Sequence, residues 1–210
     1  MIAENPFVPV RRGLIICVSG PSGVGKGTMI RKIREINPDI AHSVSVTTRS
    51  PRPDETEGVS YFFRSKDEFL QMLDTGEILE HDCYCGKYYG TPKTPLAKLV
   101  EQGIDVLMDI TVPGSLSVLK NYPEVITVFL MPPTYSELKR RLINRGTEDA
   151  RVIEMRLKKA RDEIRHAEHF QYVVVNDDLE TAASRILGII EAESCRYIHM
   201  QGIEDHVLAL

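Results

Sequence analysis

Short runs of apolar residues alternate along this chain with segments whose apolar positions recur every three or four residues. The runs occupy residues 14–18, 105–110, 125–130 and 172–175. They predict buried strands, because they are short, rich in β-branched residues and mostly apolar. The helical spacing occupies residues 29–36, 93–102, 134–143 and 179–197. Strands that alternate with helices predict an α/β domain in three layers, with a parallel sheet between two layers of helices.

Residues 43–91 follow a different pattern, of shorter extended pieces with many turn residues between them. The extended pieces fall at 43–49, 61–63, 78–81 and 87–90. Ser65 followed three residues later by Glu68 is a capping box, which predicts a helix that ends near Gly76. These residues therefore predict a small mixed lobe at 43–91, distinct from a parallel core made of 13–42 and 92–210.

The loop between the first strand and the first helix has the composition of a P-loop. Strand, glycine-rich turn and helix follow one another here, as a phosphate cradle built from backbone N–H groups requires. Lys26 would reach over the β- and γ-phosphates of a nucleotide. The expected ATP-binding residues of this loop are Gly20, Pro21, Ser22, Gly23, Val24, Gly25, Lys26, Gly27 and Thr28.

Composition and charge argue against nucleic acid and membranes as partners of this protein. The net charge of -4 argues against nucleic acid as the main partner. The four cysteines lack metal-ligand spacing, and no apolar run is long enough to span a membrane. The sequence thus predicts a cytoplasmic protein with no membrane partner, and it does not specify an oligomeric state.

Basic residues concentrate in one region, since ten of the 26 Lys and Arg residues fall between Lys139 and Arg165. Acidic residues are interspersed among them, so this region is either a solvated helix laced with ion pairs or a source of arginines for phosphate.

Two further groups suggest an acceptor site. Arg49 and Arg52, followed by Tyr61, could bind a monophosphate, because guanidinium groups donate in a fork that matches phosphate oxygens. Solvated surface arginines would give the same pattern. Glu80 could accept hydrogen bonds from guanine, with hydroxyl groups of Ser45 and Thr91 near O6.

Taken together, these motifs closely resemble the guanylate kinases over nearly the whole chain. The matching residues include Gly20–Gly23, Thr47–Arg49, Pro51–Arg52, Tyr61–Phe63, Leu79–Glu80, Tyr88–Thr91, Met108–Ile110, Arg145–Thr147, Arg156–Leu157 and Val175–Asp178. The resemblance implies an ATP:GMP phosphotransferase with a P-loop core, a GMP-binding lobe and a mobile helical lid at about 141–165. ATP, GMP and Mg²⁺ are the implied small-molecule partners.

The resemblance also implies roles for single residues. GMP phosphate binding falls on Arg49, Arg52, Tyr61 and Tyr89, and guanine recognition falls on Ser45, Glu80 and Thr91. Asn176 would lie near ATP. The implied catalytic residues are Lys26, Arg49 and the lid arginines Arg145 and Arg156, with Arg141 as a further lid candidate.

The chain departs from the family pattern at two positions. Gly27 stands where a Ser or Thr usually binds Mg²⁺, so we expect the metal to be held mainly by ATP phosphates and water, with Thr28 and Asp109 as candidate ligands. Asp109, which we also place on the GMP side, keeps the first acid of the usual D-I-D-x-Q-G segment, whereas Thr111 replaces the second. Two alternatives stay open: a kinase for another phosphorylated acceptor, such as ribose 1,5-bisphosphate, and a non-catalytic binding module on the same fold.

Overall fold

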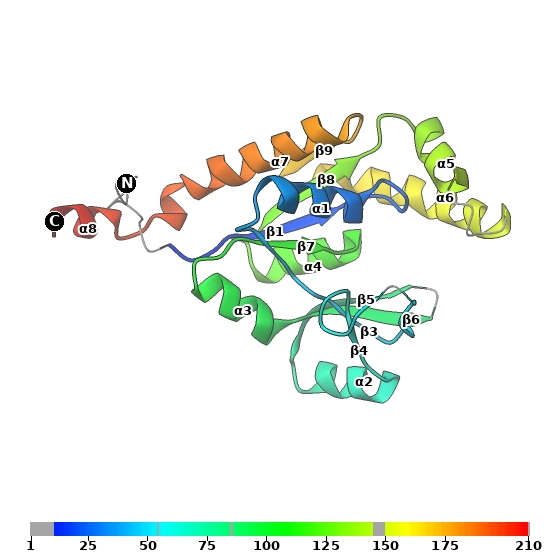
Figure 1. Cartoon of the computed structure of the whole chain (residues 1–210), viewed down its shortest axis with the longest axis horizontal. Helices are drawn as coiled ribbons and strands as arrows, with labels where there is room; N and C mark the ends of the chain where they lie inside the picture. The colour runs from blue at the N-terminus through cyan, green and yellow to red at the C-terminus, as the bar shows by residue number, and fades with distance from the viewer. Residues whose placement is uncertain (1–10, 54, 85, 145–149, 210) are drawn as a thin grey trace.

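The computed structural model describes residues 11–53, 55–84, 86–144 and 150–209. Its central element is a five-stranded sheet in which every pair of neighbouring strands is parallel (Figure 1). In spatial order the strands are β2 (Ala41–His42), β7 (Val106–Asp109), β1 (Ile15–Ser19), β8 (Ile126–Met131) and β9 (Tyr172–Val175). Strand β1 lies in the middle, so the loop that follows it opens at the centre of the sheet's carboxyl edge.

Helices cover both faces of this sheet (Figure 1), which confirms the predicted three-layer α/β fold. On one face Ile16 and Val18 of β1 pack with residues of α1 (Lys26–Ile36) and α7 (Leu179–Ser194). On the other face Cys17 packs with residues of α3 (Lys93–Glu101) and α4 (Val112–Asn121). Successive side chains of a strand point to opposite faces, which is why an apolar run without polar interruptions fits a strand covered twice.

A second sheet lies below the first in Figure 1. Its order is β4 (Phe62–Phe63), β3 (Val46–Thr47), β6 (Lys87–Pro92) and β5 (Ile78–Tyr84), with parallel and antiparallel pairs. Helix α2 (Lys66–Asp74) packs on it through Phe69, which is fully buried. The predicted capping box is present: Ser65 accepts from the Glu68 backbone N–H, and the Glu68 carboxylate accepts from Ser65 N.

Helices α5 (Tyr135–Asn144) and α6 (Ala150–Arg165) project together at the right of Figure 1. Tyr135 joins them, because its hydroxyl donates to the Leu157 carbonyl over 3.1 Å and its ring lies 4.7 Å from the Arg161 guanidinium carbon. A short 3₁₀ helix, His166–His169, leads from α6 to β9. After α7 come a second 3₁₀ turn, Tyr197–His199, and α8 (Ile203–Leu208).

The sequence pattern predicts most of these elements to within a few residues but misses α4. Pro113 and Gly114 disfavour a helix interior, but here they lie in the first turn of α4. Backbone N–H groups of the first turn have no partner within the helix, so the missing N–H of proline costs nothing there. Thr111 caps this helix by accepting from Gly114 N over 3.3 Å. Among the described residues, no helix has both the length and the apolarity needed to cross a membrane.

Candidate functional site

The loop between β1 and α1 is held in a tightly packed shape that only glycine permits at several positions. Gly23 and Gly25 have φ values of 91° and 103°, in the left-handed region. A Cβ at Gly20 would lie 2.3 Å from the Leu130 carbonyl oxygen, and one at Gly23 would lie 2.6 Å from Leu142 Cδ2. The loop ends at the N-terminus of α1, where free backbone N–H groups and the helix dipole favour an anion.

Lys26 is the first residue of α1 and turns back over the loop, where its Nζ donates to the Gly20 carbonyl over 3.0 Å. Asp109 lies opposite, at the carboxyl end of β7, in register with Val18 of β1. Burial raises the pKa of Asp109, while the positive charges of Lys26 and His42 act in the opposite direction. A partly buried carboxylate and the loop lysine therefore line the same cavity at the sheet edge.

One pocket of about 440 Å³ opens beside the loop, lined by Gly23, Gly25, Thr28 and residues of α5 and the end of β9. Asn176 donates to the Val24 carbonyl over 2.9 Å. Arg141 donates both to Val24 O, over 3.2 Å, and to Asn176 O, over 3.0 Å. These bonds tie α5 and the end of β9 to the loop, so the expected ATP residues Thr28 and Asn176 line one cavity.

A second pocket, of about 190 Å³, lies between the two sheets and joins residues far apart in sequence. The core contributes Lys26 and Asp109, and the second sheet and its loops contribute polar side chains that face them. The complete lining is Lys26, Ser45, Tyr61, Glu80, Asp82, Tyr89, Gly90, Asp109, Ile110 and Thr111. Six predicted site residues thus meet in one cavity: Lys26, Ser45, Tyr61, Glu80, Tyr89 and Asp109.

Glu80 is a buried carboxyl group of this pocket whose pKa is raised. It is 6% exposed on β5, and the Thr91 hydroxyl donates to its Oε1 over 2.8 Å. Burial raises the pKa of Glu80 to about 7, against the effect of the Thr91 hydrogen bond. The carboxylate also lies close to the first turn of α4, because a Cβ on Gly114 would be 2.4 Å from Glu80 Oε2. Glycine is therefore needed at that position for Glu80 to occupy its place.

Arg49 is fixed at the edge of the pocket by a carboxylate that sequence reasoning did not single out. Its guanidinium donates twice to Glu55, over 2.7 and 2.8 Å, and its Cζ lies 5.3 Å from the centre of the Tyr61 ring. The Arg49 hydrogen bonds lower the pKa of Glu55 to about 2. The Tyr61 and Tyr89 rings are 6.2 Å apart, so both phenols lie near this arginine.

Arg52 behaves differently from Arg49. Its side chain is exposed, and its backbone N–H donates to Glu55 over 2.8 Å. Glu55 thus holds the loop that carries both arginines. The sequence feature that could have indicated this role is the position of this acid six residues after Arg49.

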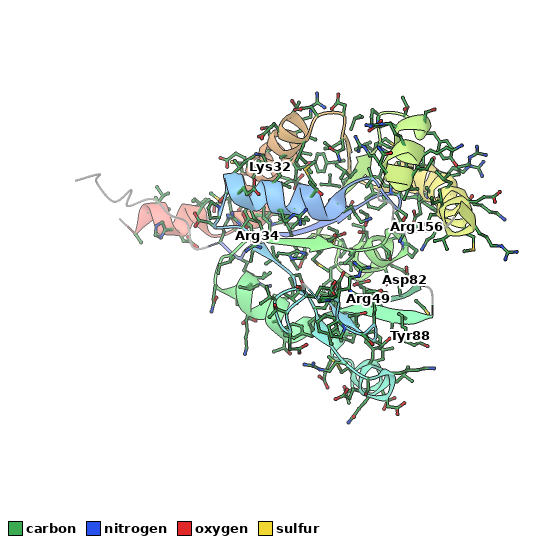
Figure 2. All side chains as sticks on the ribbon, turned by 45° about the vertical axis from the view of Figure 1, so that its right-hand side comes forward. Lys32, Arg34, Arg49, Asp82, Tyr88 and Arg156 are labelled. Carbon is green, nitrogen blue, oxygen red and sulfur yellow. The ribbon has the colours of Figure 1, made fainter. Side chains whose placement is uncertain are left out.

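Of the two expected lid arginines, the structure describes only Arg156. Arg145 lies outside the described residues. Arg156 lies on α6, and Figure 2 shows it above Arg49 and Asp82 on the same side of the molecule. Helix α6 also contacts the loop through Glu163, which is 8% exposed and accepts from Ser22 N over 3.0 Å. Glu163 was not predicted, since an acid within a basic helix looks like a surface ion-pair partner.

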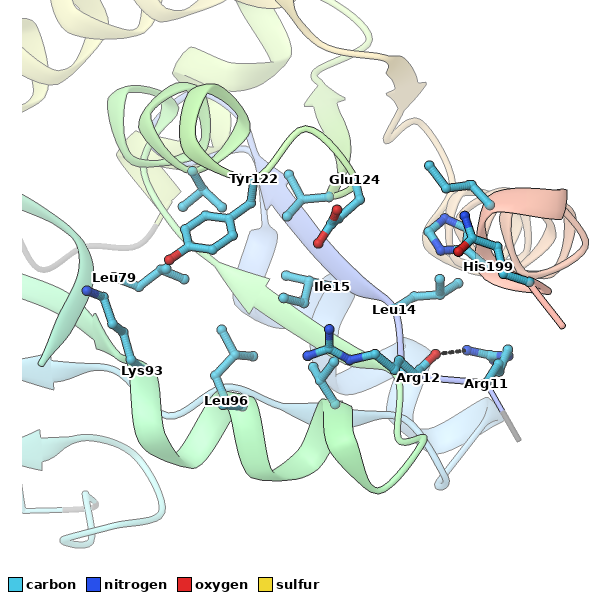
Figure 3. Close-up of a pocket in the computed structure, with 17 residues that line it drawn as sticks. Arg11, Arg12, Leu14, Ile15, Leu79, Lys93, Leu96, Tyr122, Glu124 and His199 are labelled. Carbon is cyan, nitrogen blue, oxygen red and sulfur yellow. Dashed lines mark hydrogen bonds between the residues drawn. The ribbon is translucent and has the colours of Figure 1, made fainter. Parts of the chain in front are cut away.

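A third pocket, of about 700 Å³, lies elsewhere (Figure 3). It is lined by Gly13, Leu14 and Ile15, at the amino end of β1, and by residues of α3 and the segment after α7. Ligands of open parallel sheets bind beyond the carboxyl ends of the strands. This cavity is at the opposite edge, so we do not assign it to the candidate site.

Comparisons with known proteins agree with this geometry. The family model described as guanylate kinase matches residues 11–193. The chain is 48% identical over 196 residues to a guanylate kinase of Lactococcus lactis subsp. lactis, covering 90% of this chain and 96% of that one. It is 47% identical to a guanylate kinase of Streptococcus pneumoniae strain R6, covering 87% and 88%.

A solved structure of a guanylate kinase also has the fold of this chain. The crystal structure of guanylate kinase from Anaplasma phagocytophilum superposes with a TM-score of 0.78 at 35% sequence identity, covering 94% of each chain. The resemblance expected from the motifs is confirmed on both grounds. This chain belongs to the guanylate kinase family.

Proposed function

We propose that this chain transfers the γ-phosphoryl group of ATP to GMP, giving ADP and GDP. The observation that carries the proposal is the pocket of about 190 Å³, in which the loop lysine Lys26 and the polar residues of the second sheet line one cavity. A phosphate donor on the loop and an acceptor on the second sheet would meet there. Family membership supports the same reaction.

On the donor side, backbone N–H groups of residues 20–28 bind the ATP phosphates, and Lys26 neutralises charge on the β- and γ-phosphates. Asn176 and Arg141 bracket the loop beside the adjoining cavity, where the nucleoside part of ATP would lie. Arg156, together with Arg145, supplies positive charge from the lid at 141–165. In this arrangement residues 13–42 and 92–210 form the core.

On the acceptor side, residues 43–91 form the GMP-binding lobe. Arg49, Tyr61 and Tyr89 bind the GMP phosphate, with Arg52 joining from the exposed loop. Guanine lies against Glu80, whose Oε2 accepts from the base while Oε1 is bonded to Thr91. Ser45 lies in the same pocket and directs its hydroxyl to O6. Adenine offers neither the donor pair nor O6, so this set of groups selects guanine.

The residues present fit a magnesium ion that is bound mostly by substrate and water. Among the described residues no group of three or more His, Cys, Asp or Glu side chains could hold a metal ion by themselves. Mg²⁺ keeps several waters and needs few protein oxygens, so Thr28, which lines the pocket beside the loop, or Asp109, which lines the acceptor pocket, would each add one oxygen ligand. When bound, the ion neutralises charge on the β- and γ-phosphates.

The chain's own residues then perform what phosphoryl transfer requires, which is alignment and charge stabilisation rather than covalent chemistry. Arg49 holds the acceptor phosphate in place, and Glu55 orients Arg49 through two hydrogen bonds. Lys26 and the lid arginines stabilise charge as the γ-phosphoryl group moves. Water is excluded by the lobes on either side, which keeps water from acting as the acceptor.

The testing experiment measures ADP release from ATP and Mg²⁺ with GMP, AMP, CMP, UMP and ribose 1,5-bisphosphate as acceptors. We expect efficient turnover with GMP and at least 100-fold lower kcat/KM with each of the others. Preferred turnover of another acceptor would contradict the guanine assignment. A folded protein that binds ATP but turns over no acceptor would instead support a binding module.

A further inference from the structure

Asp82 is the residue of the acceptor pocket to which neither the family resemblance nor the proposed reaction assigns a role. It lies on β5 two residues after Glu80, and residues two apart on a strand point to the same face. Its side chain lines the same cavity as Ser45, Glu80 and Thr111. Figure 2 shows Asp82 on the side of the second sheet that faces the core.

The Asp82 carboxylate is only half satisfied. Its Oδ1 accepts from the backbone N–H of Cys83 over 2.7 Å. Its Oδ2 is shielded from solvent and has no hydrogen-bond partner among the described residues. Buried polar atoms in folded proteins nearly always have partners, so an orphaned acceptor that lines a binding pocket points to a donor on the ligand. The terminal torsion of an aspartate is broad, so Oδ2 can turn toward such a donor at small cost.

Guanine has more donors than Glu80 can satisfy. Its Watson–Crick edge carries N1–H and a 2-amino group with two further N–H bonds. Oε1 of Glu80 already accepts from Thr91, and a carboxylate that faces this edge can accept from N1–H and from the amino N–H beside it. The second amino N–H points away from N1, toward the N3 side of the base, so it stays unpaired unless another acceptor lies there.

Two other oxygen-bearing side chains of the pocket, Thr111 and Asp109, have contacts of their own. Thr111 Oγ1 accepts from Gly114 N, as the cap of α4. Asp109 lies on the core side with Lys26, whose charge acts on it. Asp82 is the carboxylate that remains on the guanine side of the cavity.

We propose that Asp82 is a specificity-determining residue that accepts a hydrogen bond from the 2-amino group of guanine and so discriminates GMP from IMP, which lacks that group. This inference rests on the proposed function. Two carboxylates on one face repel each other, and besides burial the charge of Asp82 contributes to raising the pKa of Glu80. A donor placed between them relieves this repulsion, whereas hypoxanthine, with only N1–H, leaves Asp82 unpaired.

The test compares wild type with Asp82→Ala and Asp82→Asn, using GMP, dGMP and IMP as acceptors and titration calorimetry for binding. We expect Asp82→Ala to lower kcat/KM for GMP and for dGMP roughly 10- to 100-fold, the range for a hydrogen bond to a charged group. The value for IMP should change less than threefold, and the KM for ATP should stay the same. Asp74→Ala, on the exposed end of α2 in the same lobe, is the matched control and should change none of these values.

The outcomes separate this inference from the proposed function. Equal losses for GMP and IMP would overturn the inference and leave the proposed function standing. A loss with GMP that is absent with dGMP would assign Asp82 to the ribose 2′-hydroxyl and also overturn it. Wild type inactive on GMP would overturn both. Thermal melts of each variant exclude a folding defect as the cause, and Asp82→Asn, which keeps the side-chain volume, serves if the alanine variant fails to fold.

Discussion

The donor cradle and the acceptor pocket are built in opposite ways. The loop of residues 19–28 presents backbone, held by left-handed glycines and by contacts too close for any side chain at Gly20. The acceptor pocket presents side chains, carried on a second sheet and on the strand ends that face it. Backbone N–H groups recognise phosphate whatever base is attached, whereas carboxylates and hydroxyls recognise one base. Substitutions in the loop should therefore lower the rate of phosphoryl transfer, and substitutions in the acceptor pocket should change which acceptor is bound.

The largest expected effect comes from the one side chain that the cradle contributes to the chemistry. Lys26→Ala should lower kcat by at least about 1,000-fold, because it removes the positive charge that the loop itself places over the phosphates. Single-turnover assays with ATP and GMP measure this loss. The fold should be retained, since Lys26 is only partly buried.

Lys32→Ala, on the same helix and paired with Glu180, is the control and should stay within threefold of wild type. A folded Lys26→Ala variant with near-normal turnover would remove the basis for the cradle assignment.

Glu80→Gln should produce the next largest effect, and only on the acceptor side. It converts one of two acceptor oxygens into a donor facing the base, so KM for GMP should rise roughly 10- to 100-fold. The KM for ATP should change less than threefold, because Glu80 lies across the pocket from the loop. Initial rates with either substrate varied give both constants. A comparable rise for both nucleotides would mean that the two regions are not independent.

The cradle could be predicted from sequence because its shape is local. Residues 19–28 are contiguous, and the glycines, the lysine and the flanking apolar periods specify strand, turn and helix without reference to any other part of the chain. The family resemblance likewise depended on local motifs arranged in the right order. The helices with strong apolar periods and the capping box at Ser65 were predictable for the same reason.

The acceptor pocket was predictable only in part, because its geometry is set by tertiary packing. Asp82 looks like any surface acid in sequence, and it lines the pocket only because β5 pairs with β6 and packs on α4. Glu163 becomes a partner of Ser22 only because α6 folds back onto the loop. Helix α4 was missed since the proline and glycine that argue against a helix stand in its first turn, where Gly114 also makes room for Glu80.

The pH dependence of the reaction should separate the acceptor pocket from the donor cradle, because Glu80 titrates only in the pocket. Burial raises the pKa of Glu80 to about 7, and the ionised form is the one that accepts from guanine. We therefore expect kcat/KM for GMP to fall as the pH drops from 8 to 6, while the KM for ATP stays flat. Glu80→Gln should lose this dependence. A profile for wild type that is flat across this range would show that Glu80 does not titrate there.

The free energy of unfolding of wild type, compared with Glu80→Gln, should change with pH in the direction opposite to the turnover of GMP. A carboxyl whose folded pKa is raised from 4.5 to about 7 stabilises the fold below pH 4.5 and loses that contribution as the pH rises through 7. Relative to Glu80→Gln, wild type should therefore lose about 3 kcal/mol of unfolding free energy between pH 4.5 and 8. Urea unfolding at both pH values measures the difference. Binding of guanine thus requires a charge that the free protein is destabilised by carrying.

The smallest effect is expected at Gly27, where the cradle departs from the usual hydroxyl residue. Its φ is not in the left-handed region, and an added Cβ would meet its nearest neighbour, Asp109 Oδ2, at 3.9 Å, so a serine fits. Gly27→Ser should stabilise α1 by about 0.5 kcal/mol and lower the Mg²⁺ concentration for half-maximal rate roughly two- to fivefold. Gly27→Ala adds the same Cβ without the hydroxyl, so it should stabilise α1 by about 1 kcal/mol and leave the Mg²⁺ requirement unchanged. The KM for GMP should not change in either variant, because Gly27 is not among the residues that line the acceptor pocket. If serine altered GMP selection over IMP, base recognition would extend into the cradle, and the division between a backbone site for phosphate and a side-chain site for the base would fail.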